Sequence, residues 1–328
     1  MSNLQSPITH KRVALVLGSG GARGLAHIGA IEALEERGYT ISSIAGCSMG
    51  SIIAGMYAAG QLKEAKEWFL QVDKQLILRM MDINLLSVNS LVKGQRIIQE
   101  LEKVVPDRPI EQLNIPCSIV ASDMMSTEEV VFRSGSLFEA VRASISIPLF
   151  FQPVQIGQRL LIDGGILNPL PLHIIDRTEG DLLVAMDISG KDSMQTEAEP
   201  DPIDVEGRLA ELTARGIPVP KSWENQLRQL GKRVDHIRQK RAADLGRNVN
   251  FFGILDRMSD MQIQQNTLMA LRLTPPDVHA VMRQYAYNTF DFDKAEAIIA
   301  DGKRIMTNAL IEYESSSVHP SRRIALSD

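Results

Sequence analysis

One stretch of the sequence decides the fold: VALVLGSGGARGLAHIGAIEALEERG, residues 13–38. It begins with an uninterrupted apolar run, residues 13–17, which is typical of a strand buried on both faces of a parallel sheet. A glycine-rich turn follows at residues 18–24. Large apolar residues then recur at the spacing of one helix face, and Gly38 stands where helices commonly end. These face residues are Leu25, Ile28, Ile31 and Leu34.

The next residues repeat the same order of elements. A short apolar stretch, residues 41–45, runs into a second glycine turn at residues 46–50, and a helix of small residues continues to Gly60. Alternating strands and helices predict an α/β domain with a mostly parallel central sheet and helices on both faces. Further strands are expected at residues 118–122, 130–132, 160–162 and 182–188, and a closing amphipathic helix at about residues 291–313.

The domain organisation is predicted as one domain, residues 1–328, with an inserted or divergent helical region at residues 190–270. The composition changes near Ser189, because residues 191–204 are acidic, polar and proline-containing, as in a linker or loop. Residues 221–246 follow as a charged, helical segment. No internal repeat is visible.

Composition and charge exclude several classes of protein. The net charge is -5, so no overall basic field favours nucleic acid, and we expect no nucleic-acid partner. Cys47 and Cys117 are too few for a disulfide framework and indicate a reducing compartment. Residues 1–12 are polar, and no apolar run is long enough to span a bilayer, so a cytoplasmic location is expected. If the protein acted on lipid, it would meet the membrane from this side, at the inner face.

The turn at residues 46–50, GCSMG, has the pattern G-x-S-x-G. In this pattern a serine sits on a sharp strand-to-helix turn, and the flanking glycines allow the tight backbone. Ser48 is therefore a candidate nucleophile. The alternative is a plain strand-to-helix turn, which also favours glycine and serine.

Two other turns carry weaker signals. The glycine turn at residues 18–24 could bind a dinucleotide phosphate, form an oxyanion hole, or be purely structural; the G-x-G-x-x-G spacing fails because Arg23 stands at its sixth position. Asp163-Gly164-Gly165 follows a predicted strand, where a carboxylate could lie at the edge of the sheet. By itself, Asp-Gly is an ordinary turn dipeptide.

Together these three turns resemble the patatin-like phospholipase family. The family's glycine-rich oxyanion segment, G-x-S-x-G turn and D-G-G motif correspond in order to residues 20–24, 46–50 and 163–165. The resemblance extends to RASISIP, residues 142–148, to NPLP, residues 168–171, and to FDFDKA, residues 290–295. It is dense over residues 12–188 and resumes near Pro276, whereas residues 189–273 do not align.

The resemblance implies a three-layer α/β/α fold and a serine esterase that cleaves lipid acyl esters with a Ser-Asp dyad. Ser48 would be the nucleophile and Asp163 the base. The N–H groups of Gly20 and Gly21 would form the oxyanion hole, supported by Arg23. The implied substrate is a phospholipid or lysophospholipid, cleaved as by a phospholipase A or lysophospholipase, without a cofactor.

Three alternatives stay open. One is an α/β-hydrolase-like esterase with a Ser-Asp-His triad, because His173 and His279 follow Asp163 in the required order. Another is an NADP-dependent oxidoreductase that uses the Gly18 turn, and the third is a catalytically silent lipid-binding regulator. The spacing of cysteines and histidines fits no metal site, so none is expected.

Two segments could contact lipid. Residues 68–86 are rich in large apolar side chains and could form a lid or acyl pocket, or be plain core. Residues 221–246 could form a basic amphipathic helix on an anionic bilayer, which would make the protein peripheral to the membrane, or dock as a solvated helix or dimer contact.

Overall fold

The computed structural model describes residues 11–72, 76, 94–148, 150–190 and 251–318. The chain divides into two compact units, one of residues 1–192 and 259–328 and one of residues 193–258. The described part of the second unit is the beginning of helix α9 (Phe251–Leu273). The linker expected at residues 191–204, the basic helix expected at residues 221–246 and most of residues 73–86 lie outside the described residues.

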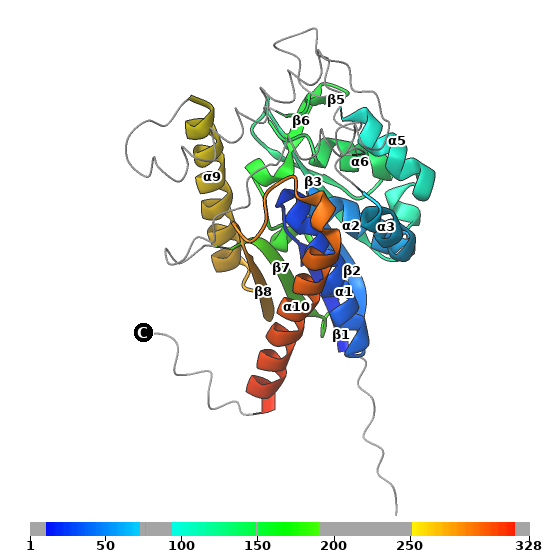
Figure 1. The fold of residues 1–328 in the computed structure, drawn as a ribbon, viewed down its shortest axis with the longest axis vertical. Coiled ribbons are helices and arrows are strands. Elements are labelled where there is room, and N and C mark those ends of the chain that lie inside the picture. Colours follow the sequence, from blue (N-terminus) through cyan, green and yellow to red (C-terminus); the bar gives the residue numbers. More distant parts are fainter. Residues whose placement is uncertain (1–10, 73–75, 77–93, 149, 191–250, 319–328) are drawn as a thin grey trace, which may run out of the picture. The chain divides into compact units, whose positions relative to one another are not determined.

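The first unit is built on a sheet that, in the described residues, has eight strands in the order β5-β6-β3-β2-β1-β7-β8, with β4 also paired to β3 (Figure 1). The strands are β1 (Lys11–Leu17), β2 (Tyr39–Cys47), β3 (Cys117–Asp123), β4 (Glu129–Phe132), β5 (Val154–Ile156), β6 (Arg159–Asp163), β7 (Leu182–Gly190) and β8 (Val278–Arg283). Strands β3, β2, β1, β7 and β8 run parallel.

The other end of the sheet is antiparallel, so the sheet is mixed, and the prediction of a mostly parallel sheet holds for its five adjacent strands. β4 and β6 run antiparallel to β3, and β5 antiparallel to β6. For β5 and β6 a short link requires the antiparallel direction: the two strands are joined by a two-residue turn in which Gly157 has φ +58°, and a parallel crossover needs a dozen residues or more. The sequence analysis did not predict β5 and β8.

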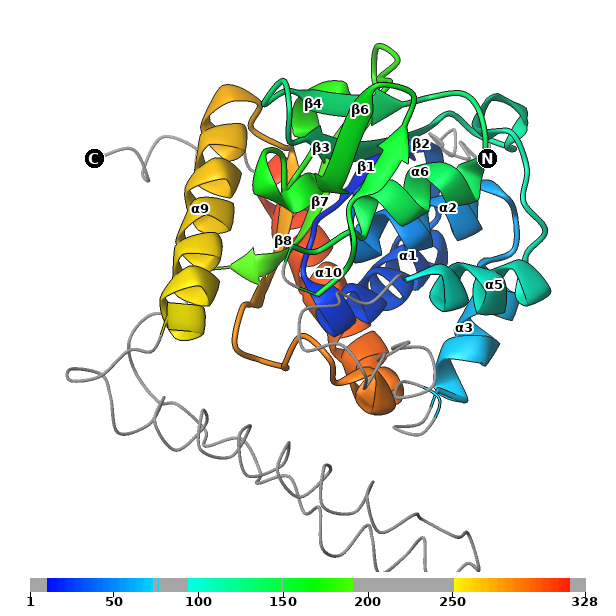
Figure 2. The same cartoon turned by 90° about the horizontal axis from the view of Figure 1, so that it is seen from above.

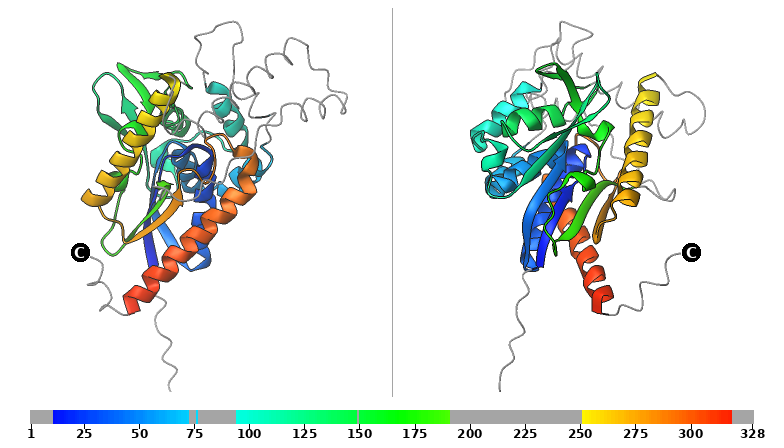
Figure 3. Two further views of the ribbon diagram at one scale, coloured as in Figure 1. Left: turned by 60° about the vertical axis from the view of Figure 1, so that its left-hand side comes forward. Right: turned by 180° about the vertical axis from the view of Figure 1, so that it is seen from behind.

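Helices cover both faces of the sheet, as predicted. One face packs against α1 (Ala26–Glu36), α2 (Met49–Ala58) and α10 (Ala295–Val318), with α3 (Leu62–Leu70), α5 (Gln95–Val104) and α6 (Leu137–Ser144) beside them. The other face packs against residues 170–175 and the Ala270–Leu271 turn of α9. Figures 2 and 3 show α9 and the α1–α10 pair on opposite sides of the strands.

The residues of β1 suit a central strand that is buried on both faces. Its alternate side chains Val13, Leu15 and Leu17 face the larger helical layer, whereas Ala14 and Val16 face the other side, and all five are fully buried. A central parallel strand between two layers needs apolar residues at every position. None of the described helices has both the length and the apolar content that crossing a bilayer requires.

Candidate active site

Ser48 lies at the turn between β2 and α2 in a conformation that few residues adopt, with φ +54° and ψ -122°. The two flanking glycines are required by space. A Cβ atom on Gly46 would lie 2.3 Å from the carbonyl oxygen of Gly50, and one on Gly50 would lie 2.3 Å from that of Leu17. The predicted strand-turn-helix geometry of G-x-S-x-G is therefore present, and it holds the serine at the carboxyl end of a central strand.

Asp163 ends β6 and meets Ser48 across the intervening strand β3. Asp163 pairs with Ala121, and Cys47 pairs with Val120, so that Ser48 follows at the level of Ala121 from the other side. The Ser48 hydroxyl donates a hydrogen bond to Asp163 Oδ2 at 2.6 Å, and the Gly165 N–H donates to Asp163 Oδ1 at 2.7 Å. The structure thus brings together the two residues that the sequence analysis paired, although 115 positions separate them.

The environment of this carboxylate adjusts its basicity. Burial raises the pKa of Asp163 to about 6, against the opposing effect of the hydrogen bonds from Ser48 and Gly165. Asp163 is 4% exposed and Ser48 is 3% exposed, so the pair is shielded from bulk water. A carboxylate with a pKa near the working pH is a better general base than an exposed aspartate.

Two N–H groups of the glycine turn have no main-chain acceptor among the described residues. Gly18, Ser19 and Ala22 donate to main-chain carbonyls, whereas Gly20 and Gly21 make no such bond to other described residues. Gly21 has φ +58° and lines the same cavity as Ser48. Two neighbouring N–H groups suit one oxyanion, and the loss of the others to the main chain argues against a dinucleotide-phosphate cradle.

Arg23 holds this turn in place through hydrogen bonds to the main chain of other segments. Its guanidinium donates to the carbonyl oxygens of Ile188 at 2.9 Å and Tyr287 at 3.0 Å, and the Ala22 N–H donates to Thr289 at 2.9 Å. Burial lowers the pKa of Arg23, and nearby acidic groups, Asp260 foremost, oppose this effect. Arg23 therefore ties the glycine turn to the end of β7 and the loop after β8.

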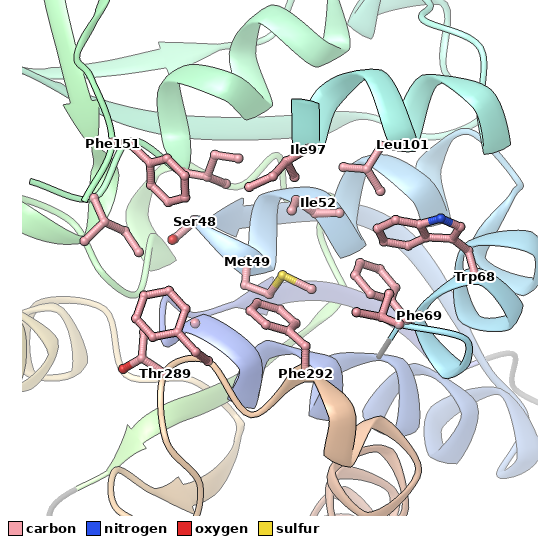
Figure 4. A pocket seen from close by; sticks show the side chains of 15 residues that line it. Ser48, Met49, Ile52, Trp68, Phe69, Ile97, Leu101, Phe151, Thr289 and Phe292 are labelled. Atoms are coloured by element: carbon pink, nitrogen blue, oxygen red, sulfur yellow. The ribbon is translucent and has the colours of Figure 1, made fainter. Parts of the chain in front are cut away.

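An apolar cavity opens at Ser48, and the empty space between its walls, counted together with the adjoining open solvent, is about 760 Å³. Figure 4 shows Ser48 at one end and Trp68, Phe69 and Leu101 at the other. Its lining residues are apolar except for Ser48 and Thr289: Gly21, Ser48, Met49, Ile52, Trp68, Phe69, Val72, Ile97, Leu101, Ile145, Ile147, Phe151, Thr289, Phe290 and Phe292. Of the apolar segment noted at residues 68–86, the structure places Trp68, Phe69 and Val72 in this cavity wall. The sequence analysis missed the walls from α5 and the loop before α10.

The described histidines lie apart from the dyad. His27 is fully buried and its Nε2 bonds the Gly18 carbonyl oxygen at 2.9 Å, and burial lowers its pKa to about 4. His173 pairs with Glu129 at 2.8 Å, and His279 with Asp187 at 3.4 Å. The Ser48 hydroxyl instead bonds a carboxylate directly, which favours a dyad over the triad. His10, His236 and His319 lie outside the described residues.

No group of three or more His, Cys, Asp and Glu side chains is arranged to hold a metal in the part of the chain that the structure describes. Cys47 and Cys117 are free and buried, and burial raises the pKa of both thiols, that of Cys117 to about 12. Neither cysteine is therefore a reactive thiolate.

The fold and the site define a class: α/β proteins with a buried serine on a strand-to-helix turn, bonded to a carboxylate and open to an apolar cavity. Comparisons with known proteins identify the family within that class. Residues 15–176 match the Patatin-like phospholipase family. Over these residues, which make up just under half of the chain, the protein carries a patatin-like phospholipase domain.

The relatives support the same assignment. An uncharacterized NTE family protein of Mycobacterium bovis is 44% identical over 182 residues, which cover 56% of this chain and 50% of that protein. The human patatin-like phospholipase domain-containing protein 6 is 34% identical over 198 residues, 58% of this chain and 14% of that protein. The chain therefore spans about half the length of the mycobacterial relative and a smaller part of the human one.

A solved structure supports the fold alone. VipD from Legionella pneumophila superimposes with a TM-score of 0.50 at 15% identity, covering 93% of this chain and 67% of that one.

Proposed function

We propose that this protein hydrolyses carboxylic esters of phospholipids or lysophospholipids through an acyl-Ser48 intermediate, with Asp163 as the base. The observation that supports it is the 2.6 Å hydrogen bond from the Ser48 hydroxyl to Asp163 at one end of the apolar cavity. A serine hydroxyl is a poor nucleophile without an adjacent base, and an apolar cavity suits an acyl chain.

The first half of the reaction forms the acyl-enzyme. Ser48 Oγ attacks the ester carbonyl carbon while its proton passes to Asp163 Oδ2, and the carbonyl oxygen becomes an oxyanion. The N–H groups of Gly20 and Gly21 stabilise this charge; one such donor is typically worth about 3 kcal/mol. The carbon–oxygen bond to the alcohol then breaks, and Asp163 returns the proton to the leaving oxygen.

The second half releases the fatty acid. Asp163 accepts a proton from a water molecule, the resulting hydroxide attacks the acyl carbonyl, and the bond to Ser48 Oγ breaks. The proton returns to Ser48, which restores the dyad. Arg23 takes no proton in this sequence and acts through the shape of the glycine turn.

Labelling with a fluorophosphonate probe tests the proposal. We expect the label on Ser48 alone. Ser48→Ala and Asp163→Asn should each lower ester hydrolysis by roughly 1,000-fold or more while the circular dichroism spectrum is unchanged. His173→Ala and His279→Ala are the controls and should keep most activity.

Three results would contradict the proposal. Labelling of another residue in active protein would remove Ser48 as the nucleophile. A loss of several orders of magnitude at either histidine, with the fold preserved, would favour a triad. Vesicle binding without turnover of any ester would instead indicate a lipid-binding regulator.

A further inference from the structure

A short segment at the end of α6 holds the main chain of both dyad residues. The Ser48 N–H donates to Ser144 Oγ at 2.9 Å, and the Asp163 N–H donates to the Ser146 carbonyl oxygen at 3.0 Å. Ser144 and Ser146 are both fully buried. Neither belongs to the reacting groups, yet each bonds to one of them.

The bond to Ser48 satisfies a group that the turn leaves without a strand partner. Ser48 follows the last residue of β2 and has positive φ, so its N–H lies beyond the ladder with β3. A buried N–H without an acceptor is strongly disfavoured. The Ser144 hydroxyl supplies that acceptor and stabilises the strained conformation that presents Ser48 Oγ.

The bond to Asp163 replaces a missing strand. β5 pairs with β6 only as far as Val154 opposite Leu161, so Asp163 lies past the end of β5. The Ser146 carbonyl oxygen takes the place of a β5 residue there. Asp163 is therefore held from both edges of β6, by Ala121 of β3 on one edge and by the Ser146 carbonyl oxygen on the other.

The segment is itself held firmly. Ser146 Oγ donates to the Arg142 carbonyl oxygen at 2.8 Å and accepts from the Arg142 guanidinium at 2.6 Å. Arg142 also donates to the Gln152 carbonyl oxygen at 3.1 Å. Residues 144–146 thus form a braced link between two strands that do not pair with each other, β2 and β6.

We propose that residues 144–146 act as a clamp that sets the separation of Ser48 Oγ and Asp163 Oδ2, with Ser144 as a positioning residue for the reaction. The inference rests on the proposed roles of Ser48 and Asp163. Nucleophile and base lie on separate strands, and their contact therefore depends on whatever fixes both strand ends. A displacement of roughly 1 Å can lower the rate about 100-fold.

Ser144→Ala tests the clamp because it removes the acceptor for Ser48 N–H and leaves both dyad side chains in place. With a small soluble ester, we expect kcat to fall on the order of 10- to 100-fold while KM changes little. The acid limb of the pH profile of kcat/KM should move to higher pH, because the hydrogen bond from Ser48 lowers the pKa of Asp163 and is weakened in the variant. Labelling of Ser48 by a fluorophosphonate should slow in parallel with kcat.

Ser43→Ala is the matched control. Ser43 is also a buried serine of β2, but it lies in the middle of the strand, away from the turn, and donates to the Asp176 carbonyl oxygen. Its loss should lower stability without changing kcat or the acid limb. Ser144→Cys keeps roughly the size of the side chain but offers a weaker acceptor, so its kcat should fall less than that of Ser144→Ala. If the alanine variant does not fold, the cysteine variant provides the test.

The outcomes separate this inference from the proposed function. If wild-type Ser48 is not labelled, the proposed function fails. If wild-type Ser48 is labelled and the Ser144 variants react at the wild-type rate, or match Ser43→Ala with an unmoved acid limb, the clamp alone is overturned. A fall in kcat with a shifted acid limb in Ser144→Cys and Ser144→Ala supports it.

Discussion

At the scale of single residues, the site is controlled by how deeply Asp163 is buried. The same burial that raises the pKa of Asp163 to about 6 also makes its charged form costly to the folded protein. The proposed general base is therefore also a group whose charged form destabilises the fold. Two measurements follow from this.

The first is the pH dependence of hydrolysis. Only the deprotonated Asp163 can accept the Ser48 proton, so kcat/KM should be constant above pH 7. It should fall about tenfold per pH unit below the pKa of about 6. A soluble ester measured from pH 4 to 9 provides the profile. A histidine base would show the same limb, so the His173→Ala and His279→Ala profiles serve as controls and should overlay the wild type.

The second is the stability of Asp163→Asn. Because its pKa is raised, Asp163 binds a proton more tightly in the folded than in the unfolded chain, and wild-type stability is lost as the pH rises through about 6. The neutral variant should therefore be more stable than wild type by about 1 to 3 kcal/mol at pH 8, and the difference should shrink between pH 6 and pH 4. Urea unfolding at several pH values measures it. A variant less stable than wild type at every pH would show that the charged form is well solvated.

At the scale of elements, the cavity is assembled mainly from α2, α3, α5, the segment that follows α6 and the loop before α10. α2 and α3 follow each other along the chain, whereas the others lie farther on in the sequence, and each element contributes apolar side chains to a common space (Figure 4). The wall from α5 includes Ile97 and Leu101, and Ile97 is only partly buried. A larger side chain at Ile97 can therefore enter the cavity with little disturbance of the core.

Ile97→Trp should shorten the acyl chain that the enzyme accepts. Each buried CH₂ is worth about 0.8 kcal/mol, or roughly fourfold, so losing the room for three or four should lower kcat/KM for long-chain esters roughly 100-fold. Acetate esters should be hydrolysed at the wild-type rate. A chain-length series of soluble esters measures this. Ile311→Trp makes the same exchange at an exposed position of α10 and is the control; a uniform loss at all chain lengths would contradict the assignment.

At the scale of the whole molecule, the substrate must be reached at a surface. The net charge of -5 repels anionic lipid, so any attraction must be local. Trp68 and Phe69 line the cavity, which makes them less available as membrane contacts than the sequence alone suggested. The basic residues at positions 228–241, which lie outside the described residues, remain the candidate: Arg228, Lys232, Arg233, Arg238, Lys240 and Arg241.

We expect vesicle binding to rise with anionic lipid content and to weaken as salt is raised. Each basic residue near an anionic surface contributes about 1 kcal/mol, and the effect fades within a Debye length. Replacing Arg233, Arg238 and Arg241 by glutamate should reduce sedimentation with vesicles while hydrolysis of a soluble ester stays near wild type. Normal vesicle binding by the triple variant would mean that the segment has no lipid contact.

The sequence by itself determined the strand-turn-helix units at residues 13–60 and the residues that could react. Periodicity, glycine spacing and the turns around Ser48 and Asp163 are local properties, so they can be recognised in the sequence before the fold is known. The two strands that it did not predict lacked clear signals. β5 has only three residues, and the alternation of buried and exposed positions in β8 is hidden in its sequence because the exposed Val281 is apolar.

Only the tertiary structure decided how these residues meet. The register of β2, β3 and β6 brings Ser48 and Asp163 to the same level, and residues 144–146 bond to both. Arg23 finds its acceptors at Ile188 and Tyr287, which are 165 and 264 positions away. Such contacts join residues that no local pattern relates, because strand order and register are set by packing of the whole sheet and not by any one segment.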